Sequence, residues 1–225
     1  VKAMLKEMPK KYWHNMPETA LVPGLIKSAQ ARESAMIENS RVAVAEAGGV
    51  ARLHDEARRC TRCPRYAPAT QVVFGEGPGT APLMFVGEQP GDQEDIAGQP
   101  FVGPAGQVFN RALAAAGVDR QQTYVTNAVK HFKFTLRGKR RIHDRPNSGE
   151  IEACRWWLER EIDTVQPRLI VALGATALRS LTGKTMSVTK ARAAEVRSIE
   201  GKPVLATVHP SFLLRLPDAD SAVRE

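Results

Sequence analysis

Short apolar runs alternate with longer amphipathic stretches along the chain from residue 49 onward. Four runs have the length of a strand and end at a polar or glycine-containing loop: Leu83–Val86, Tyr124–Thr126, Leu169–Leu173 and Val204–Thr207. Helical periodicity lies between them, over Gly106–Ala116, Ser148–Gln166 and Ala175–Leu181. This alternation predicts an α/β fold of three α/β/α layers, in which helices cover both faces of a central four-stranded, mainly parallel sheet.

The N-terminal part of the chain has a different pattern. Residues 1–37 are basic, a helical pattern covers residues 24–40, and Ala47-Gly48-Gly49 resembles a linker. We predict that residues 1–48 are the C-terminal remnant of a fused N-terminal domain of unknown function plus this linker. Residues 49–225 then form the functional domain. Within it, Ser148 is predicted to cap the helix that follows, with Glu150 in its first turn.

The net charge of the chain indicates what kind of partner it binds. Lys and Arg exceed Asp and Glu by 32 to 24, which gives a net charge of +8 and a pI near 9.7. An anionic partner is therefore expected, and nucleic acid is the commonest one. No apolar run has the length of a membrane span or the form of a signal peptide. We expect a cytoplasmic monomer that has no membrane partner.

Much of the positive charge is concentrated in one segment, residues 130–145, which holds seven cationic residues and one acid. Burying so many cations would cost too much free energy, so the sequence predicts a solvent-facing loop that meets phosphate. An ordinary solvated basic surface is the alternative. Three members of this loop, Lys139, Arg140 and Arg141, are the predicted DNA contacts.

The cysteines suggest a metal centre. Cys60 and Cys63 form a C-x-x-C pair, and Cys154 supplies a third thiolate. The pair does not lie in a βαβ unit, which argues against a thioredoxin-like redox site. His131 is the best candidate for a fourth ligand. Zinc with three cysteines and one histidine and an iron–sulfur cluster with one histidine ligand would use the same residues, so spacing leaves both open.

Polar motifs follow three of the predicted strands. They are Gly87-Glu88-Gln89-Pro90-Gly91-Asp92 after the first, Asn127 at the second and His209-Pro210-Ser211 after the fourth. Ligands of parallel sheets bind at the carboxyl ends of the strands, so one shared cleft is expected. Phe101 lies on a Gly/Pro-rich turn before a helix. It is either a core residue or a ring presented to a flat heterocycle.

Together, these motifs resemble the uracil-DNA glycosylase superfamily, and within it the iron–sulfur family-4 branch, from about residue 57 to residue 215. The chain departs from the family-4 pattern in two places. It has His131 where that pattern expects cysteine, and it carries an insertion, absent from that pattern, that ends at His143. Both departures, together with Gln89 and Asp92, resemble the X-type glycosylases, which become covalently attached to uracil-containing DNA.

This resemblance implies a 4Fe-4S cluster held by the three cysteines and His131. It implies catalytic roles for four residues: His143, Glu88, Gln89 and His209. Phe101, Asn127, Gly87 and Asp92 would bind the uracil nucleotide. Ser211, Leu213, Leu214 and Arg215 would enter the DNA, with single strands preferred.

In the implied reaction His143 attacks C1′ of the sugar once the base has left. Attack needs a neutral imidazole, which the neighbouring Arg140 and Arg141 favour. Glu88 accepts the other ring N–H, and His209 donates to uracil O2. Two alternatives remain open: an ordinary multiple-turnover glycosylase, and a non-catalytic nucleic-acid-binding module that contains zinc.

Overall fold

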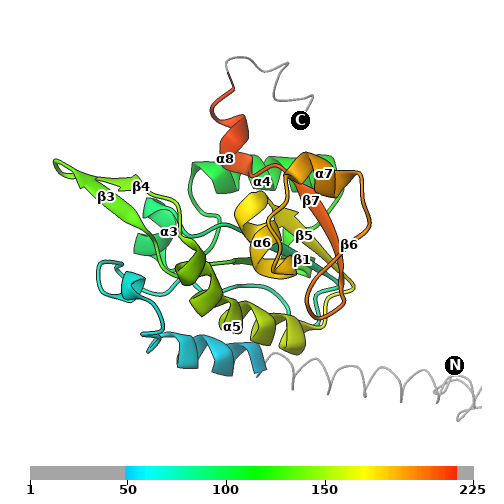
Figure 1. Cartoon of the computed structure of the whole chain (residues 1–225), viewed down its shortest axis with the longest axis horizontal. Coiled ribbons are helices and arrows are strands. Elements are labelled where there is room, and N and C mark those ends of the chain that lie inside the picture. Colours follow the sequence, from blue (N-terminus) through cyan, green and yellow to red (C-terminus); the bar gives the residue numbers. More distant parts are fainter. Residues whose placement is uncertain (1–48, 217–225) are drawn as a thin grey trace, which may run out of the picture. The chain divides into compact units, whose positions relative to one another are not determined.

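A computed structural model describes residues 49–216 of the chain, and the predictions for residues 1–48 lie outside the described residues. At its centre is a five-stranded sheet (Figure 1). In spatial order its strands are β2 (Thr123–Asn127), β1 (Leu83–Gly87), β5 (Leu169–Leu173), β7 (Pro203–Thr207) and β6 (Val196–Arg197). The first four run parallel, as predicted. The antiparallel β6 was not predicted, because two residues are too few to show an alternating pattern.

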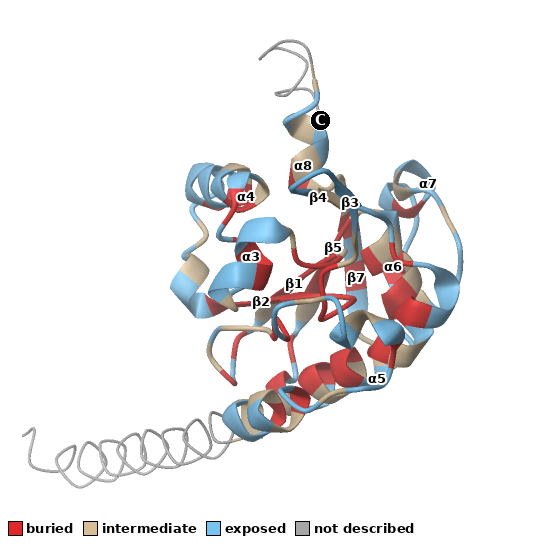
Figure 2. Cartoon of the chain, turned by 90° about the vertical axis from the view of Figure 1, so that its left-hand side faces the viewer, coloured by how far each residue is buried: buried red, intermediate tan, exposed pale blue. Residues whose placement is uncertain are grey.

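Helices cover both faces of the sheet, so the three-layer prediction is confirmed. On one face, α5 (Ser148–Val165) and α6 (Ala175–Thr182) pack against Met84 and Val86 of β1. On the other face, α4 (Pro104–Ala115) packs against Phe85 of the same strand. Successive side chains of a strand point to opposite faces, and both sets are buried (Figure 2).

Short elements complete the described part of the chain. They are α3 (Asp92–Ala97), α7 (Val188–Arg192), α8 (Pro210–Leu213) and the 3-10 turns at Pro64–Tyr66 and Arg120–Gln122. A helix at residues 49–57 lies at the start of the described region. Between residues 49 and 216, none of the helices is both long enough and apolar enough to span a bilayer.

The first turn of α5 corrects one prediction. Asn147, not Ser148, is the N-cap, and its side chain accepts a hydrogen bond from the Glu150 backbone N–H at 2.9 Å. In turn, the Glu150 carboxylate accepts a hydrogen bond from the Asn147 backbone N–H at 2.7 Å. This capping box starts the helix one residue earlier than expected, since Asn and Ser are equally good caps and sequence alone does not choose between them.

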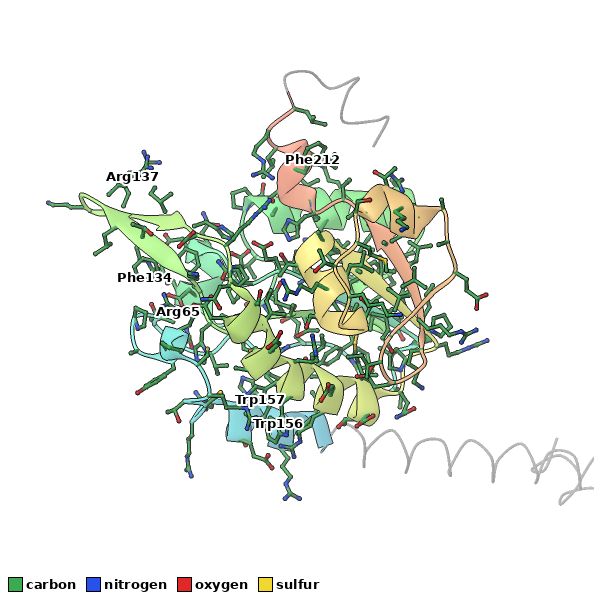
Figure 3. All side chains as sticks on the ribbon, viewed as in Figure 1. Arg65, Phe134, Arg137, Trp156, Trp157 and Phe212 are labelled. Carbon is green, nitrogen blue, oxygen red and sulfur yellow. The ribbon has the colours of Figure 1, made fainter. Side chains whose placement is uncertain are left out.

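The basic segment also differs from the prediction. It is not a loop throughout: β3 (Phe134–Arg137) and β4 (Arg140–His143) pair as an antiparallel hairpin that projects from the domain (Figure 1). An isolated two-stranded ribbon keeps its cations in water, so the cost of burial does not arise there. Figure 3 shows Arg137 at the outer end of this hairpin.

At the start of the same segment, Lys130 and His131 are buried, which contradicts the prediction of solvent exposure. Lys130 is fully buried because its ammonium pairs with Glu161 of α5, whose side chain is also fully buried. The ammonium also donates to Thr126 Oγ1 and to the Asn127 carbonyl, each at 2.7 Å. A buried charge is tolerated when it is paired and fully hydrogen-bonded, and Lys130 meets both conditions.

Candidate functional site

The ends of β1, β2 and β7 bring the predicted site residues together. Gly87 is in register with Asn127 on the neighbouring strand. His209 follows β7, which pairs with β5 on the other side of β1. The loop after β1 is fixed by two backbone bonds, from Ala128 N–H to the Gly87 carbonyl and from Val129 N–H to the Glu88 carbonyl. The residues of the predicted cleft therefore meet at the carboxyl edge of the sheet.

Phe101 forms one wall of this cleft. Its backbone adopts a left-handed conformation with φ of 57°, which is uncommon for an aromatic residue. A Cβ on Gly106 would lie 1.9 Å from the Phe101 carbonyl oxygen, so glycine at 106 is what allows this turn to close. The ring is buried, packs on Phe109 at 5.0 Å and lies 6.0 Å from the His209 ring. The structure thus shows Phe101 as a core residue that also lies beside His209.

Asn127 presents an unpaired polar atom to the cleft. The residue is 2% exposed, and its Oδ1 has no hydrogen-bond partner within the described residues. A Cβ added to Gly87 would lie 2.3 Å from this oxygen and 2.6 Å from Phe101 Cζ. Glycine at 87 therefore lets the amide and the aromatic ring pack closely against the backbone of β1. A buried unsatisfied acceptor costs about 1–3 kcal/mol, and a ligand N–H would remove that cost.

The tautomer of His209 follows from its neighbours. The Ser211 backbone N–H donates to Nδ1 at 3.2 Å, and the Ser211 hydroxyl lies 2.9 Å from the same nitrogen. Burial lowers the pKa of His209 to about 4, although Glu88 acts in the opposite direction. The ring is therefore neutral near pH 7. Because Nδ1 accepts a hydrogen bond, the proton is on Nε2, which is free to donate to a ligand.

Glu88 connects the cleft to the hairpin. Its Oε1 lies 3.6 Å from His143 Nε2, which is within ion-pair range but longer than a hydrogen bond. Its other oxygen accepts a short hydrogen bond from the Thr176 hydroxyl in the first turn of α6. The His143 side chain is 47% exposed at the end of β4, so it is open to a ligand from one side and faces a carboxylate on the other.

Gln89 holds the base of the hairpin. Its Nε2 donates to the carbonyls of Lys133 and Asp144, both at 3.1 Å, and its Oε1 accepts from the Lys133 N–H at 3.3 Å. Lys133 precedes β3 and Asp144 follows β4, so one buried amide ties both ends of the hairpin to the loop after β1. Gln89 therefore acts on the position of His143.

A second anchor comes from Arg141 of β4. Its guanidinium pairs with Asp92 and, at 2.6 Å, with the fully buried Asp95 of α3. It also lies over the rings of Phe132 and Phe134, 5.4 and 5.2 Å from their centroids. In the structure Arg141 and Asp92 thus pair with each other. The sequence had predicted that Arg141 contacts DNA and that Asp92 binds the uracil nucleotide.

The residues predicted to contact DNA lie in the hairpin and in or just after α8. Lys139 and Arg140 are exposed at the turn of the hairpin. Ser211 and Leu213 are half-buried in α8, and Leu214 and Arg215, just after it, are exposed. Phe212 is 37% exposed on the same helix (Figure 3).

The predicted metal ligands come from three segments: Cys60 and Cys63 precede the 3-10 turn at Pro64–Tyr66, His131 follows β2, and Cys154 lies on α5. All three cysteines are free thiols, and Cys60 and Cys63 both act electrostatically on Cys154. Burial raises the pKa of the Cys154 thiol to about 12, so a metal must displace its proton to bind. Burial lowers the pKa of His131 and keeps its ring neutral, and the buried Nδ1 has no partner within residues 49–216.

The chemistry of these residues suits either metal centre. Thiolates and a neutral imidazole ligate both zinc and iron–sulfur clusters. Three free thiols and a buried imidazole nitrogen without a partner among residues 49–216 supply those ligand types. Across residues 49–216 no three side chains of His, Cys, Asp or Glu form a group that could hold one metal ion.

Three further residues were not identified from sequence. Thr176 fixes Glu88, and Lys130 with Glu161 joins the end of β2 to α5. Glu161 did carry a signal, because it occupies a buried position in the apolar stripe of α5 next to Ile162. A carboxylate in such a stripe needs a buried cation.

Comparisons with known proteins agree on one family. The family model described as the uracil DNA glycosylase superfamily matches residues 74–225. A type-4 uracil-DNA glycosylase of Thermotoga maritima is 40% identical over 162 residues, covering 72% of this chain and 81% of that protein. Type-4 enzymes of Pyrobaculum aerophilum and Archaeoglobus fulgidus are each 35% identical, over 74% and 72% of this chain and 85% and 81% of their own.

Proposed function

Because this chain belongs to the uracil DNA glycosylase superfamily, we propose that it excises uracil from DNA and then becomes covalently joined to the abasic sugar through His143. The substrate is uracil-containing DNA. Single strands are preferred, because a base that is already unpaired costs less to draw into the cleft.

Uracil recognition rests on the unpaired amide of Asn127. Uracil N3–H would donate to Oδ1, and O4 would accept from the amide nitrogen. Cytosine presents the opposite pattern and would leave buried groups unpaired, which is how such a site rejects an analogue. Stacking on Phe101 contributes about 1–3 kcal/mol.

Bond cleavage uses the neutral His209. As the C1′–N1 bond breaks, its electron pair passes to the base, and Nε2–H of His209 donates to uracil O2 as negative charge develops there. The sugar becomes an oxocarbenium cation. This assignment rests on the hydrogen bonds from Ser211 to Nδ1, which leave Nε2 as the protonated nitrogen.

The observation that carries the covalent step is the 3.6 Å approach of His143 to Glu88 at the mouth of this cleft. A lone pair on one ring nitrogen forms the bond to C1′. The proton on the other ring nitrogen is taken up by Glu88, which also fixes the tautomer. In the competing reaction water captures the cation and the enzyme turns over, as the similarity to type-4 enzymes equally allows.

We further propose that Cys60, Cys63, Cys154 and His131 hold a 4Fe-4S cluster, supported by the free thiols and the orphaned imidazole nitrogen. When bound, the cluster supplies a cross-link between the Cys60–Cys63 loop, the end of β2 and α5. His131→Cys should retain iron, since thiolate is the commoner ligand, and His131→Ala should lose it. Unchanged iron content in His131→Ala would remove His131 from the ligand set.

Incubation with a uracil-containing single-stranded oligonucleotide, followed by denaturing electrophoresis, tests the reaction. A retarded protein–DNA band supports covalent trapping. Strand cleavage after alkali, without that band, indicates multiple turnover. If the DNA is neither cross-linked nor cleaved, the remaining interpretation is a protein that binds nucleic acid without catalysis. His143→Ser should abolish the band and retain alkali-sensitive cleavage, and an oligonucleotide with thymine in place of uracil is the control.

A further inference from the structure

Trp157 is a buried hydrogen-bond donor with no part in the cleft. It lies on α5, is 3% exposed, and its indole Nε1–H donates to Cys60 Sγ at 3.1 Å. Figure 3 shows Trp156 and Trp157 on the edge of α5 that faces the helix at residues 49–57. The tertiary fold therefore brings together two residues 97 positions apart in the chain.

Packing fixes the direction of this donor. The Trp157 ring meets Phe74 edge to face at 5.8 Å and Trp156 at 4.6 Å, and the Arg160 guanidinium lies 5.8 Å from its centroid. A buried indole N–H needs an acceptor. A protonated thiol is a weak acceptor, whereas a metal-bound thiolate sulfur carries negative charge and accepts strongly.

We infer that Trp157 donates a hydrogen bond to the sulfur of a cluster ligand and thereby raises the reduction potential of the cluster. The inference rests on the proposed 4Fe-4S centre. The positive end of the N–H dipole points at Cys60 Sγ, so it stabilises the reduced, more negative state more than the oxidised state. Hydrogen bonds to ligand sulfurs are among the factors that set the potentials of such clusters.

A second N–H group also donates to the sulfur of a predicted ligand, but mutation cannot easily remove it. The Lys130 backbone N–H lies 3.2 Å from Cys154 Sγ. A backbone donor survives every substitution except proline. Of these two sulfur donors, Trp157 is therefore the one that a side-chain replacement can remove.

The test uses the full chain purified without oxygen, with Trp157→Phe as the variant. Phenylalanine keeps an aromatic ring against Phe74 and removes the N–H. Trp156→Phe is the matched control, because Trp156 contacts Arg62 and Arg160 at 4.5 and 4.6 Å through its ring, while the indole N–H that contacts Cys60 belongs to Trp157. Iron content, the visible spectrum and the midpoint potential are measured for each protein.

We expect Trp157→Phe to have a more negative midpoint potential at unchanged iron content, and Trp156→Phe to match the wild type. Equal potentials in all three proteins would overturn the inference. An equal shift in both variants would also overturn it, because the cause would then be general packing or solvent access. A wild-type protein without iron or visible absorption would instead refute the proposed cofactor.

If Trp157→Phe does not fold, the wild-type protein still gives a test. The chain has three tryptophans: Trp13, Trp156 and Trp157. In the reduced protein labelled with ¹⁵N-indole, the Trp157 N–H proton should show a strongly temperature-dependent paramagnetic shift that the Trp156 N–H proton lacks. Trp156→Phe and Trp13→Phe together assign the three resonances. Three indole protons at ordinary shifts would refute the hydrogen bond.

Discussion

Replacing Lys130 with methionine tests how the end of β2 is held. Methionine has nearly the same length as lysine but no charge. The substitution removes the ammonium that pairs with Glu161 and that donates to Thr126 and to the Asn127 carbonyl. It leaves the Glu161 carboxylate fully buried and without its cation.

The size of the effect follows from what remains around Glu161. Breaking a buried ion pair by removing one partner costs about 3–5 kcal/mol. Glu161 keeps three donors: the Tyr124 hydroxyl at 3.0 Å, the Thr126 hydroxyl at 2.9 Å and the Gly75 N–H at 3.1 Å. Because these bonds still stabilise the carboxylate, we expect a loss near the lower limit, about 3 kcal/mol.

Urea denaturation at pH 7 measures the free energy of unfolding. Arg197→Met is the control, since Arg197 pairs with Glu195 at 2.7 Å on the surface, and exposed pairs contribute at most about 1 kcal/mol. A double variant, Lys130→Met with Glu161→Met, should recover much of the loss because no buried charge remains. A single-variant loss below about 1 kcal/mol, or a double variant no more stable than the single, would refute this reasoning.

Three further predictions concern the cleft. Gly87→Ala should lower kcat/KM for uracil release by about 100-fold, since its Cβ would lie 2.3 Å from Asn127 Oδ1; activity near wild type, with circular dichroism unchanged, would show that the base does not enter there. Gln89→Glu cannot donate to the two carbonyls at the hairpin base, so His143 should form the adduct more slowly while uracil release persists; equal slowing of both steps would contradict this. His209, with a pKa lowered to about 4, should stay neutral as pH falls through 6.5. The stability that it contributes is therefore complete above pH 6.5 and is lost as pH falls toward 4, and an NMR titration midpoint near 6.5 would contradict it.

The four parallel strands were predictable because each is a short apolar run between polar breaks, and burial on both faces requires such a run. The cap of α5 and the short strand β6 were not. Asn147 and Ser148 are both good caps, and Val196–Arg197 becomes a strand only because β7 offers a free edge. These details depend on contacts with neighbours that are distant in the sequence.

The basic segment shows the same limit. Its composition predicts exposure, which holds for Lys139 and Arg140 at the hairpin turn. Composition gives no sign that Lys130 is buried, because its partner Glu161 is 31 residues away. Nor does it reveal that Arg141 is held by Asp92 and the buried Asp95.

By itself the sequence determined the α/β class, the strand ends that carry Gly87, Asn127 and His209, and the residues able to ligate a metal. Those features are local, since each depends on a run of apolar residues or on the chemistry of one side chain. Only the tertiary structure decided which atoms face one another, such as Glu88 toward His143 and the Trp157 indole toward Cys60. Hydrogen bonds and ion pairs act over a few ångströms in space, and the folded chain alone determines which distant residues come that close.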